Sequence, residues 1–297
     1  MKLITNQQIL DLKISPSQIY EWVSKSIEKK ELTILPPKIS LHPFGEVFYN
    51  TMPCILPYKN VEGIKTVNRY PGRVPALNST ILLHDLKNGN LKALMDGDYI
   101  TSMRTGAVAV HSIRLFAKEG YDTLGFIGLG NTCMAVLDIL LHVETEKNFK
   151  IKLYKYKDQA EKFIARYKHY KNLEFTVCKT YEEVIQGSHV VVSCVTVAKD
   201  NFCENQYFDK GCLVIPVHTR GFQNCDLFFD KIYGDDTGHI CGFKYFNRFH
   251  SFAEVSDVVT GKKAGRKTND ERILVYNIGL AIHDIYIAEE IYKILSI

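Results

Sequence analysis

A short apolar run leads into a glycine-rich turn near the middle of the chain, and this feature constrains the fold most. The run spans Thr123–Ile127, the turn is Gly128-Leu129-Gly130, and an apolar helical pattern extends from Met134 to Val143. Glycines let a phosphate approach the backbone, and the following helix presents free N–H groups to it. The third small residue is Cys133 rather than glycine, so the turn alone is a weak signal. Together, strand, turn and helix predict a dinucleotide-binding site.

The sequence after Tyr121 alternates between strand and helix patterns. Further strands are predicted at Lys150–Tyr156, Leu173–Val177, His189–Val195 and Cys212–Val217. A helix is predicted at Asp158–Tyr167, and another starts at Thr180, which forms a capping-box pattern with Glu183. Such alternation is typical of a Rossmann-type, doubly wound parallel sheet in an α/β protein.

The dinucleotide is expected at the carboxyl edge of this sheet. The predicted cofactor-binding residues are Thr105, Gly128, Leu129, Gly130, Asn131, Thr132, Lys155, Tyr156, Lys157, Cys194, Val195, Thr196 and Val217. Cations at the end of the second strand accept a 2′-phosphate, whereas an acid there binds a ribose 2′-hydroxyl. Lys155 and Lys157 therefore favour NADP, and the nearby Asp158 leaves NAD open.

The N-terminal third of the chain has a different pattern of apolar and polar residues. Short apolar runs broken by Pro, Gly and Asn between Leu32 and Met95 predict a largely antiparallel sheet, and Asn88-Gly89 predicts a hairpin within it. Ser15-Pro16 is typical of a helix start. A helix is also expected from about Ser102 to Ala117, and a long one over Arg272–Ile297.

The chain is therefore expected to form two domains. Residues 119–272 form the Rossmann domain, and residues 1–118 form an α+β domain that residues 273–297 complete with their helix.

Three charged side chains are candidates for chemistry. Arg104, beside Thr101 and Thr105 at a helix start, suits a carboxylate or phosphate, although a surface helix cap has the same pattern. Lys65 lies in an apolar run, where it either serves proton transfer with a lowered pKa or points to water from an edge strand. His218 follows a predicted strand and is either a proton-transfer group or a hydrogen-bonded loop residue.

Composition argues against several other classes of protein. The net charge of +4 is spread along the chain, which argues against nucleic-acid binding. The eight cysteines form no C-x-x-C pair and often lie in apolar runs, as expected for free thiols in a reducing cytoplasm. Neither a signal peptide nor a membrane span is predicted, and the histidines show no metal-like spacing, so no metal is expected.

Several ordered segments resemble one known family, that of ornithine cyclodeaminase and mu-crystallin. The matching segments are PPK at 36–38, TMPC at 51–54, GIKTV at 63–67, ALMDGDYITSMRTGA at 93–107, GLGN at 128–131, AEVSDVVTGKKAGR at 253–266 and YNIGLAIHDIYIA at 276–288. The resemblance implies a homodimer whose first domain holds the substrate and the subunit contact. It also implies hydride transfer between a nicotinamide and the α-carbon of a small amino or imino acid.

By the same resemblance, Lys38, Lys65 and Arg104 surround the substrate carboxylate, and Met52 lies in a substrate-binding motif. Lys38 stands where the family usually has Arg. The lysine keeps the positive charge but cannot bind a carboxylate through two parallel hydrogen bonds as a guanidinium does. Ornithine cyclodeaminases carry a Glu where this chain has Asn50, and an Asp where it has His218 or Thr219. Losing both carboxylates removes the groups best suited to the side-chain ammonium of ornithine.

The expected function is thus an NAD(P)-dependent oxidoreductase, either a ketimine reductase or an amino-acid or opine-type dehydrogenase. Arg104, Lys65 and His218 are its expected catalytic residues. Ornithine cyclodeaminase is the first alternative. A non-catalytic protein of the mu-crystallin type that binds NADP or a small ligand is the second.

Overall fold

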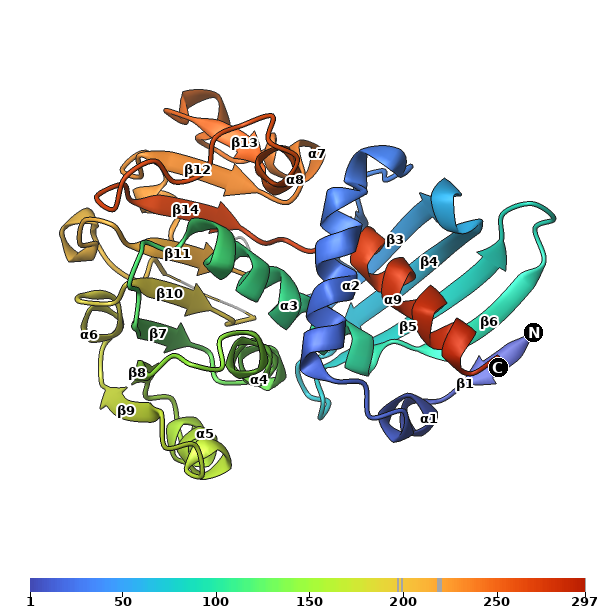
Figure 1. The fold of residues 1–297 in the computed structure, drawn as a ribbon, viewed down its shortest axis with the longest axis horizontal. Coiled ribbons are helices and arrows are strands. Elements are labelled where there is room, and N and C mark those ends of the chain that lie inside the picture. Colours follow the sequence, from blue (N-terminus) through green and yellow to red (C-terminus); the bar gives the residue numbers. More distant parts are fainter. Residues whose placement is uncertain (197, 199, 218–220, 297) are drawn as a thin grey trace. The chain divides into compact units, whose positions relative to one another are not determined.

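The computed structural model describes every residue except 197, 199, 218–220 and 297. The chain divides into two compact units. Unit 1 comprises Met1–Arg104 with Leu280–Ile297, and unit 2 comprises Thr105–Gly279. The first division falls inside helix α3 (Asp98–Phe116). Figure 1 shows the elements in chain order by colour.

Unit 1 is built on one sheet. Its strands, in spatial order, are β1 (Lys2–Ile4), β6 (Leu91–Asp96), β5 (Leu77–Asp85), β4 (Val61–Arg69), β3 (Phe48–Leu56) and β2 (Ile39–Leu41). Neighbours from β2 to β6 are antiparallel, whereas β1 runs parallel to β6. The predicted hairpin is confirmed, because β5 and β6 are joined through a turn in which Gly89 has φ +70°. Such a turn favours glycine.

Helices cover one face of this sheet. Besides the first residues of α3, the helices of unit 1 are α1 (Asn6–Asp11), α2 (Pro16–Glu28) and α9 (Ala281–Ile294). The predicted start of α2 is confirmed, because Ser15 is its N-cap and Pro16 its first residue. In Figure 1, α9 lies across β4 and β5 with α2 beside it. Alternate residues of β3, β4 and β5 are buried on the face that α9 covers, as the pattern of β4 shows.

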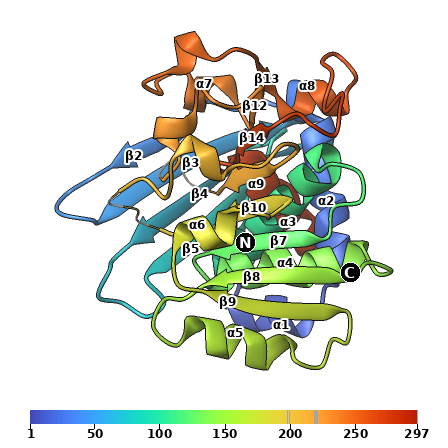
Figure 2. The ribbon, with the colours of Figure 1, turned by 90° about the vertical axis from the view of Figure 1, so that its left-hand side faces the viewer.

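Unit 2 contains the predicted parallel sheet. Its strands, in spatial order, are β13 (Phe252–Glu254), β12 (Lys231–Gly234), β14 (Ile273–Tyr276), β11 (Leu213–Pro216), β10 (Val190–Ser193), β7 (Thr123–Ile127), β8 (Phe149–Tyr154) and β9 (Leu173–Cys178). Every neighbouring pair is parallel. Figure 2 shows β10, β7, β8 and β9 side by side. The Rossmann-type fold class is confirmed.

Helix α3 continues into unit 2 from Thr105, and the other helices of this unit follow its strands. They are α4 (Asn131–Val143), α5 (Gln159–Tyr167), α6 (Tyr181–Ile185), α7 (Thr237–Ile240) and α8 (Val255–Val259). The capping box of Thr180 and Glu183 is confirmed at the start of α6.

The prediction of one long helix over Arg272–Ile297 is wrong. Residues Ile273–Tyr276 form β14, which lies between β11 and β12, and the helix begins only at Ala281. All four residues of β14 are buried, as expected for a strand covered on both faces. An apolar run of this length fits either a buried strand or a buried helix, and only pairing with its neighbours decides between them.

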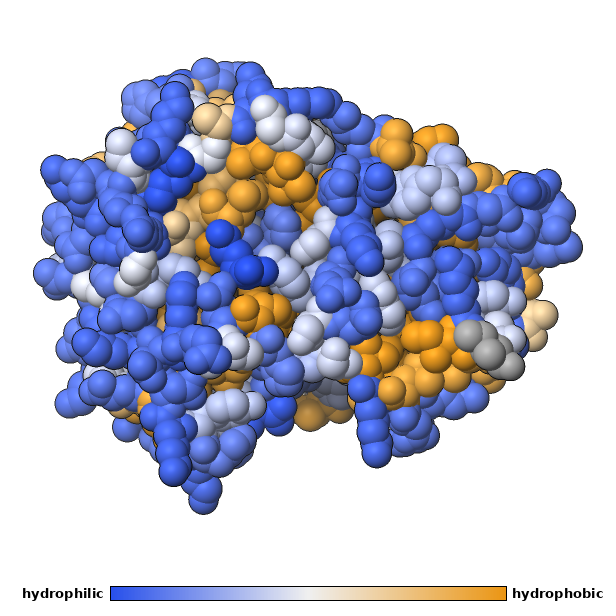
Figure 3. Space-filling model, viewed as in Figure 1, coloured by the Kyte–Doolittle hydropathy of each residue, from blue (hydrophilic) through white to orange (hydrophobic). Residues whose placement is uncertain are grey.

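The surface is mostly hydrophilic on the side shown in Figure 3, with hydrophobic patches between. All eight cysteines are free. Within the described part of the chain, no helix combines the length and apolar character needed to span a bilayer.

Candidate active site

A buried cluster of charges lies in unit 1. The Lys65 side chain is 0% exposed, and its Nζ donates to Asp284 Oδ1 at 2.8 Å. Arg104 Nε donates to the same oxygen at 3.1 Å. The interpretation of Lys65 as an edge-strand lysine pointing to water is therefore wrong. The cluster joins β4, α3 and α9, which are far apart in the sequence.

A glycine explains how α9 comes so close to β4. Alternation along β4 places Gly63 and Lys65 on the buried face. A Cβ added to Gly63 would lie 2.7 Å from Ile285 Cδ1 and 2.7 Å from the backbone oxygen of Leu82. Only glycine leaves room for the helix here, and the residue before Ile285 is Asp284. The approach that Gly63 permits therefore brings the carboxylate to Lys65.

The charged groups of the cluster shift one another's pKa values. Burial lowers the pKa of Lys65 to about 7, and the Arg104 guanidinium adds to this effect. Asp284 opposes it, whereas Lys38 lowers the pKa of Lys65 slightly further. Burial alone would raise the pKa of Asp284, but Arg104 and Lys65 hold it below its ordinary value. One carboxylate thus faces several cations, and such a site suits an anionic ligand.

The other substrate residues predicted from the sequence belong to the same unit. Met52 on β3 pairs in register with Lys65 and is buried. Lys38 precedes β2 and is half-buried, close enough for its charge to act on Lys65. Asn50 Oδ1 is buried and has no hydrogen-bond partner among the described residues. The Thr101 hydroxyl donates to Ser79 Oγ at 2.9 Å.

Asp284 is the residue of this cluster that the sequence analysis missed. Its segment, IHDIYIA, carries only a family resemblance in the sequence, although an acid on an otherwise apolar helix is costly unless it is paired. That cost is a signal that points to a buried partner, but it does not say which one.

The glycine turn of unit 2 leads from β7 into the N-terminus of α4. Gly128 has φ +83°, and a Cβ there would lie 2.7 Å from the backbone nitrogen of Val195. Gly130 is the N-cap of α4, and a Cβ there would meet nothing within 4 Å. The first turn of α4 contains no acidic residue, so its positive end is not neutralised.

Strand order places the other predicted cofactor residues at the same edge. The chain proceeds from β7 to β8 and β9 on one side and returns to β10 on the other, which makes β7 and β10 a topological switch point. The segments that leave the neighbouring strands at this edge are Cys194–Thr196 after β10, Val217 after β11 and Lys155–Lys157 after β8. Asn131 and Thr132 open α4. Thr105 precedes Gly106, whose Cα packs against Ala135 of α4.

The residues after β8 are exposed. Lys155, Tyr156 and Lys157 all face solvent, and Lys157 has φ +51°. Asp158 pairs with Lys162 at 2.7 Å in α5. His218 lies outside the described residues. The described residues also contain no group of three or more His, Cys, Asp or Glu side chains that could hold a metal ion.

The model of the ornithine cyclodeaminase/mu-crystallin family matches residues 13–296. This chain belongs to that family. The resemblance inferred from the short segments is therefore confirmed over nearly the whole sequence.

Relatives of this chain are named for different activities. The nodulation efficiency protein NfeD of Rhizobium meliloti is 27% identical over 270 residues, covering 87% of this chain and 83% of that protein. The Delta(1)-pyrroline-2-carboxylate reductase of Bacillus cereus is 25% identical over 308 residues, covering 94% of this chain and 92% of the reductase.

Two solved structures of the same fold cover 99% of this chain. One is Delta(1)-pyrroline-2-carboxylate reductase of Thermococcus litoralis in complex with NADH and L-proline, with TM-score 0.88, 22% identity and 97% of that chain covered. The other is an archaeal alanine dehydrogenase dimer with bound NAD, with TM-score 0.84, 24% identity and 96% of that chain covered.

Proposed function

We propose that this chain is an NAD(P)-dependent oxidoreductase that transfers hydride at the α-carbon of a small amino or imino acid. The observation that carries the proposal is the buried cluster of Lys65, Arg104 and Asp284, which combines an anion-binding guanidinium with an amine of lowered pKa. Family membership and relatives named as a pyrroline-2-carboxylate reductase and an alanine dehydrogenase support the same class of reaction.

Each residue has a distinct task in this proposal. Arg104 and Lys38 bind the substrate carboxylate and orient the α-carbon. When bound, the nicotinamide supplies the hydride or accepts it. In the reducing direction, the C=N π bond opens as carbon receives the hydride, and nitrogen takes a proton from the Lys65 ammonium. Lys65 is left as the neutral amine, which burial favours, and regains its proton from solvent.

The test is the absorbance of NADPH or NADH mixed with the purified protein and a five- or six-membered cyclic ketimine carboxylate. We expect oxidation that depends on the ketimine. Release of ammonia from ornithine without net cofactor turnover would instead identify a cyclodeaminase. Tight cofactor binding with no turnover over a broad panel of amino and keto acids would identify a binding protein.

The residues after β8 are proposed to select NADP over NAD. Replacing Lys155 and Lys157 together by alanine should raise the KM for NADPH about 10-fold or more relative to that for NADH, because one or two charge-assisted bonds to the 2′-phosphate are lost. Steady-state kinetics with both cofactors measures the change. Lys150→Ala, at the opposite end of β8, is the matched control and should leave the ratio unchanged. An unchanged ratio in the double variant would contradict the assignment.

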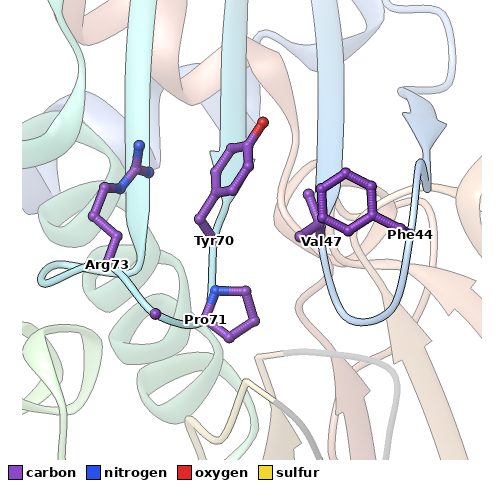
Figure 4. A pocket seen from close by; sticks show the side chains of 6 residues that line it. Phe44, Val47, Tyr70, Pro71 and Arg73 are labelled. Carbon is purple, nitrogen blue, oxygen red and sulfur yellow. The ribbon is translucent and has the colours of Figure 1, made fainter.

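We also propose that the protein acts as a homodimer in the cytoplasm. The free cysteines suit a reducing compartment. Unit 1 exposes large apolar side chains around β2, since Ile39, Leu41 and Phe44 are 59%, 57% and 66% exposed. A groove of about 700 Å³ adjoins them, lined by Phe44, Val47, Tyr70, Pro71, Gly72 and Arg73. In Figure 4, Phe44 and Val47 flank one loop, and Tyr70, Pro71 and Arg73 lie along another.

The combined substitution Ile39→Asp and Leu41→Asp should convert the dimer into a monomer. Two carboxylates on an edge strand oppose burial of that strand against a second copy. Light scattering coupled to size exclusion gives the mass directly. Leu10→Asp alters an exposed leucine of α1 in the same unit and should leave the dimer intact. A doubly substituted protein that remains dimeric would place the subunit contact elsewhere.

A further inference from the structure

We propose that Asp284 is a positioning residue for Lys65, holding its ammonium in place and keeping it protonated for transfer to the substrate nitrogen. This inference rests on the proposed function and deepens it. Helix α9 thereby becomes part of the catalytic apparatus and not only a cover for the sheet.

The geometry of Asp284 sets it apart from an ordinary structural ion pair. One oxygen, Oδ1, accepts from both Lys65 and Arg104, and the whole side chain is 0% exposed. The other oxygen, Oδ2, is buried and has no hydrogen-bond partner among the described residues. A buried ion pair contributes little net stability, and an unpaired carboxylate oxygen subtracts from it. Stability alone therefore does not account for this carboxylate.

The surrounding groups show what Asp284 does to Lys65. Charged groups face the amine from every packed element: Arg104 from α3, Asp284 from α9, and Lys38 from the segment before β2. Burial, Arg104 and Lys38 all favour the neutral amine, and among the described groups Asp284 alone opposes them. Burial and the Asp284 charge raise the pKa of the Cys54 thiol, and His283 adds to the cations that hold the pKa of Asp284 down.

The balance leaves the pKa of Lys65 at about 7, so much of the amine carries its proton near neutrality. Without the Asp284 carboxylate, the remaining influences all lower this pKa, and Lys65 would be neutral at pH 7. A neutral amine cannot protonate the imine nitrogen. Asp284 therefore determines the pH range in which reduction proceeds.

The experiment compares Asp284→Asn with the wild type. In the wild type, kcat/KM for ketimine reduction should fall as pH rises through about 7, because the protonated amine is lost. The pH at which kcat/KM falls to half is the inflection of this profile. In Asp284→Asn the inflection should move to lower pH by roughly 1–3 units, the size of effect that a close opposite charge has on a pKa. Asp284→Glu retains the charge and should keep the inflection near that of the wild type while lowering kcat.

The control is a second buried carboxylate on the same helix. Glu289 binds Lys92 Nζ at 2.8 and 2.6 Å and is 2% exposed. Glu289→Gln should lower the unfolding temperature without moving the inflection. An Asp284→Asn inflection that stays at the wild-type pH would overturn the inference, because a merely structural carboxylate reduces activity equally at every pH.

A measurement without turnover separates this inference from the proposed function. Lysine labelled with carbon-13 at Cε reports each amine's titration by NMR, and the Lys65 signal is the one missing from Lys65→Ala. We expect its midpoint to move toward acid in Asp284→Asn, and an unmoved midpoint would overturn the inference. A moved midpoint in a protein that reduces no ketimine would instead overturn the proposed function alone.

Discussion

Replacing Lys65 by alanine should lower kcat for ketimine reduction by about 10²- to 10⁴-fold, the usual contribution of a general acid. The side chain is fully buried and donates to Asp284, so the variant removes the only amine that this cluster of Lys65, Arg104 and Asp284 contains. Binding of NADPH, followed by its fluorescence, should remain near the wild-type affinity, because the glycine turn belongs to the other unit. Small primary amines added to the buffer should restore part of the activity by occupying the space left by the side chain.

The matched control for this variant is Lys92→Ala. Lys92 is also paired with a buried carboxylate of α9, so its loss should reduce stability to a similar degree. Its kcat should stay close to the wild-type value. Near-normal turnover in Lys65→Ala would refute the role of this lysine in proton transfer.

Replacing Arg104 by lysine should raise the KM for the imino acid by about 10- to 100-fold, equivalent to losing one hydrogen bond to a charged group. The guanidinium uses Nε for Asp284, and among the described residues no partner occupies its two terminal nitrogens, which can form a bidentate pair with the substrate carboxylate. A lysine keeps the charge but offers neither the fork nor a second bond. Initial rates at varied imino acid and saturating cofactor measure the change.

Arg114→Lys provides the comparison on the same helix. Arg114 makes an exposed salt bridge with Glu144, so its conservative replacement should leave every kinetic constant unchanged. A KM for the imino acid that is insensitive to Arg104→Lys would show that another cation binds the carboxylate.

Much of unit 2 could be predicted because its signals are local. The strand before Gly128, the capping box at Thr180 and the apolar runs near β10 and β11 each report the structure of a few neighbouring residues. Parallel strands covered on both faces have continuous apolar sequences, which makes them easy to recognise. The fold class and the position of the glycine turn follow from such patterns.

The charge cluster could be predicted only in part, because its partners are distant in the sequence. Lys65 and Arg104 stand out as charges in apolar surroundings, but 219 residues separate Lys65 from Asp284. No periodicity indicates which carboxylate will meet a buried lysine. For the same reason the sequence of β14 also fits the start of a helix, since only the tertiary fold sets which strands it pairs with.

The discontinuity of unit 1 has a consequence for synthesis of the chain. The ribosome makes β1 to β6 first and then all of unit 2 before it makes α9. Until α9 emerges, the nascent sheet lacks the helix that packs on β3, β4 and β5 and the carboxylate that pairs with Lys65 and Arg104. Unit 2, a continuous segment, has all its strands available earlier. We therefore expect the nascent chain to acquire a folded cofactor domain while its other unit still depends on chaperones to shield the open sheet.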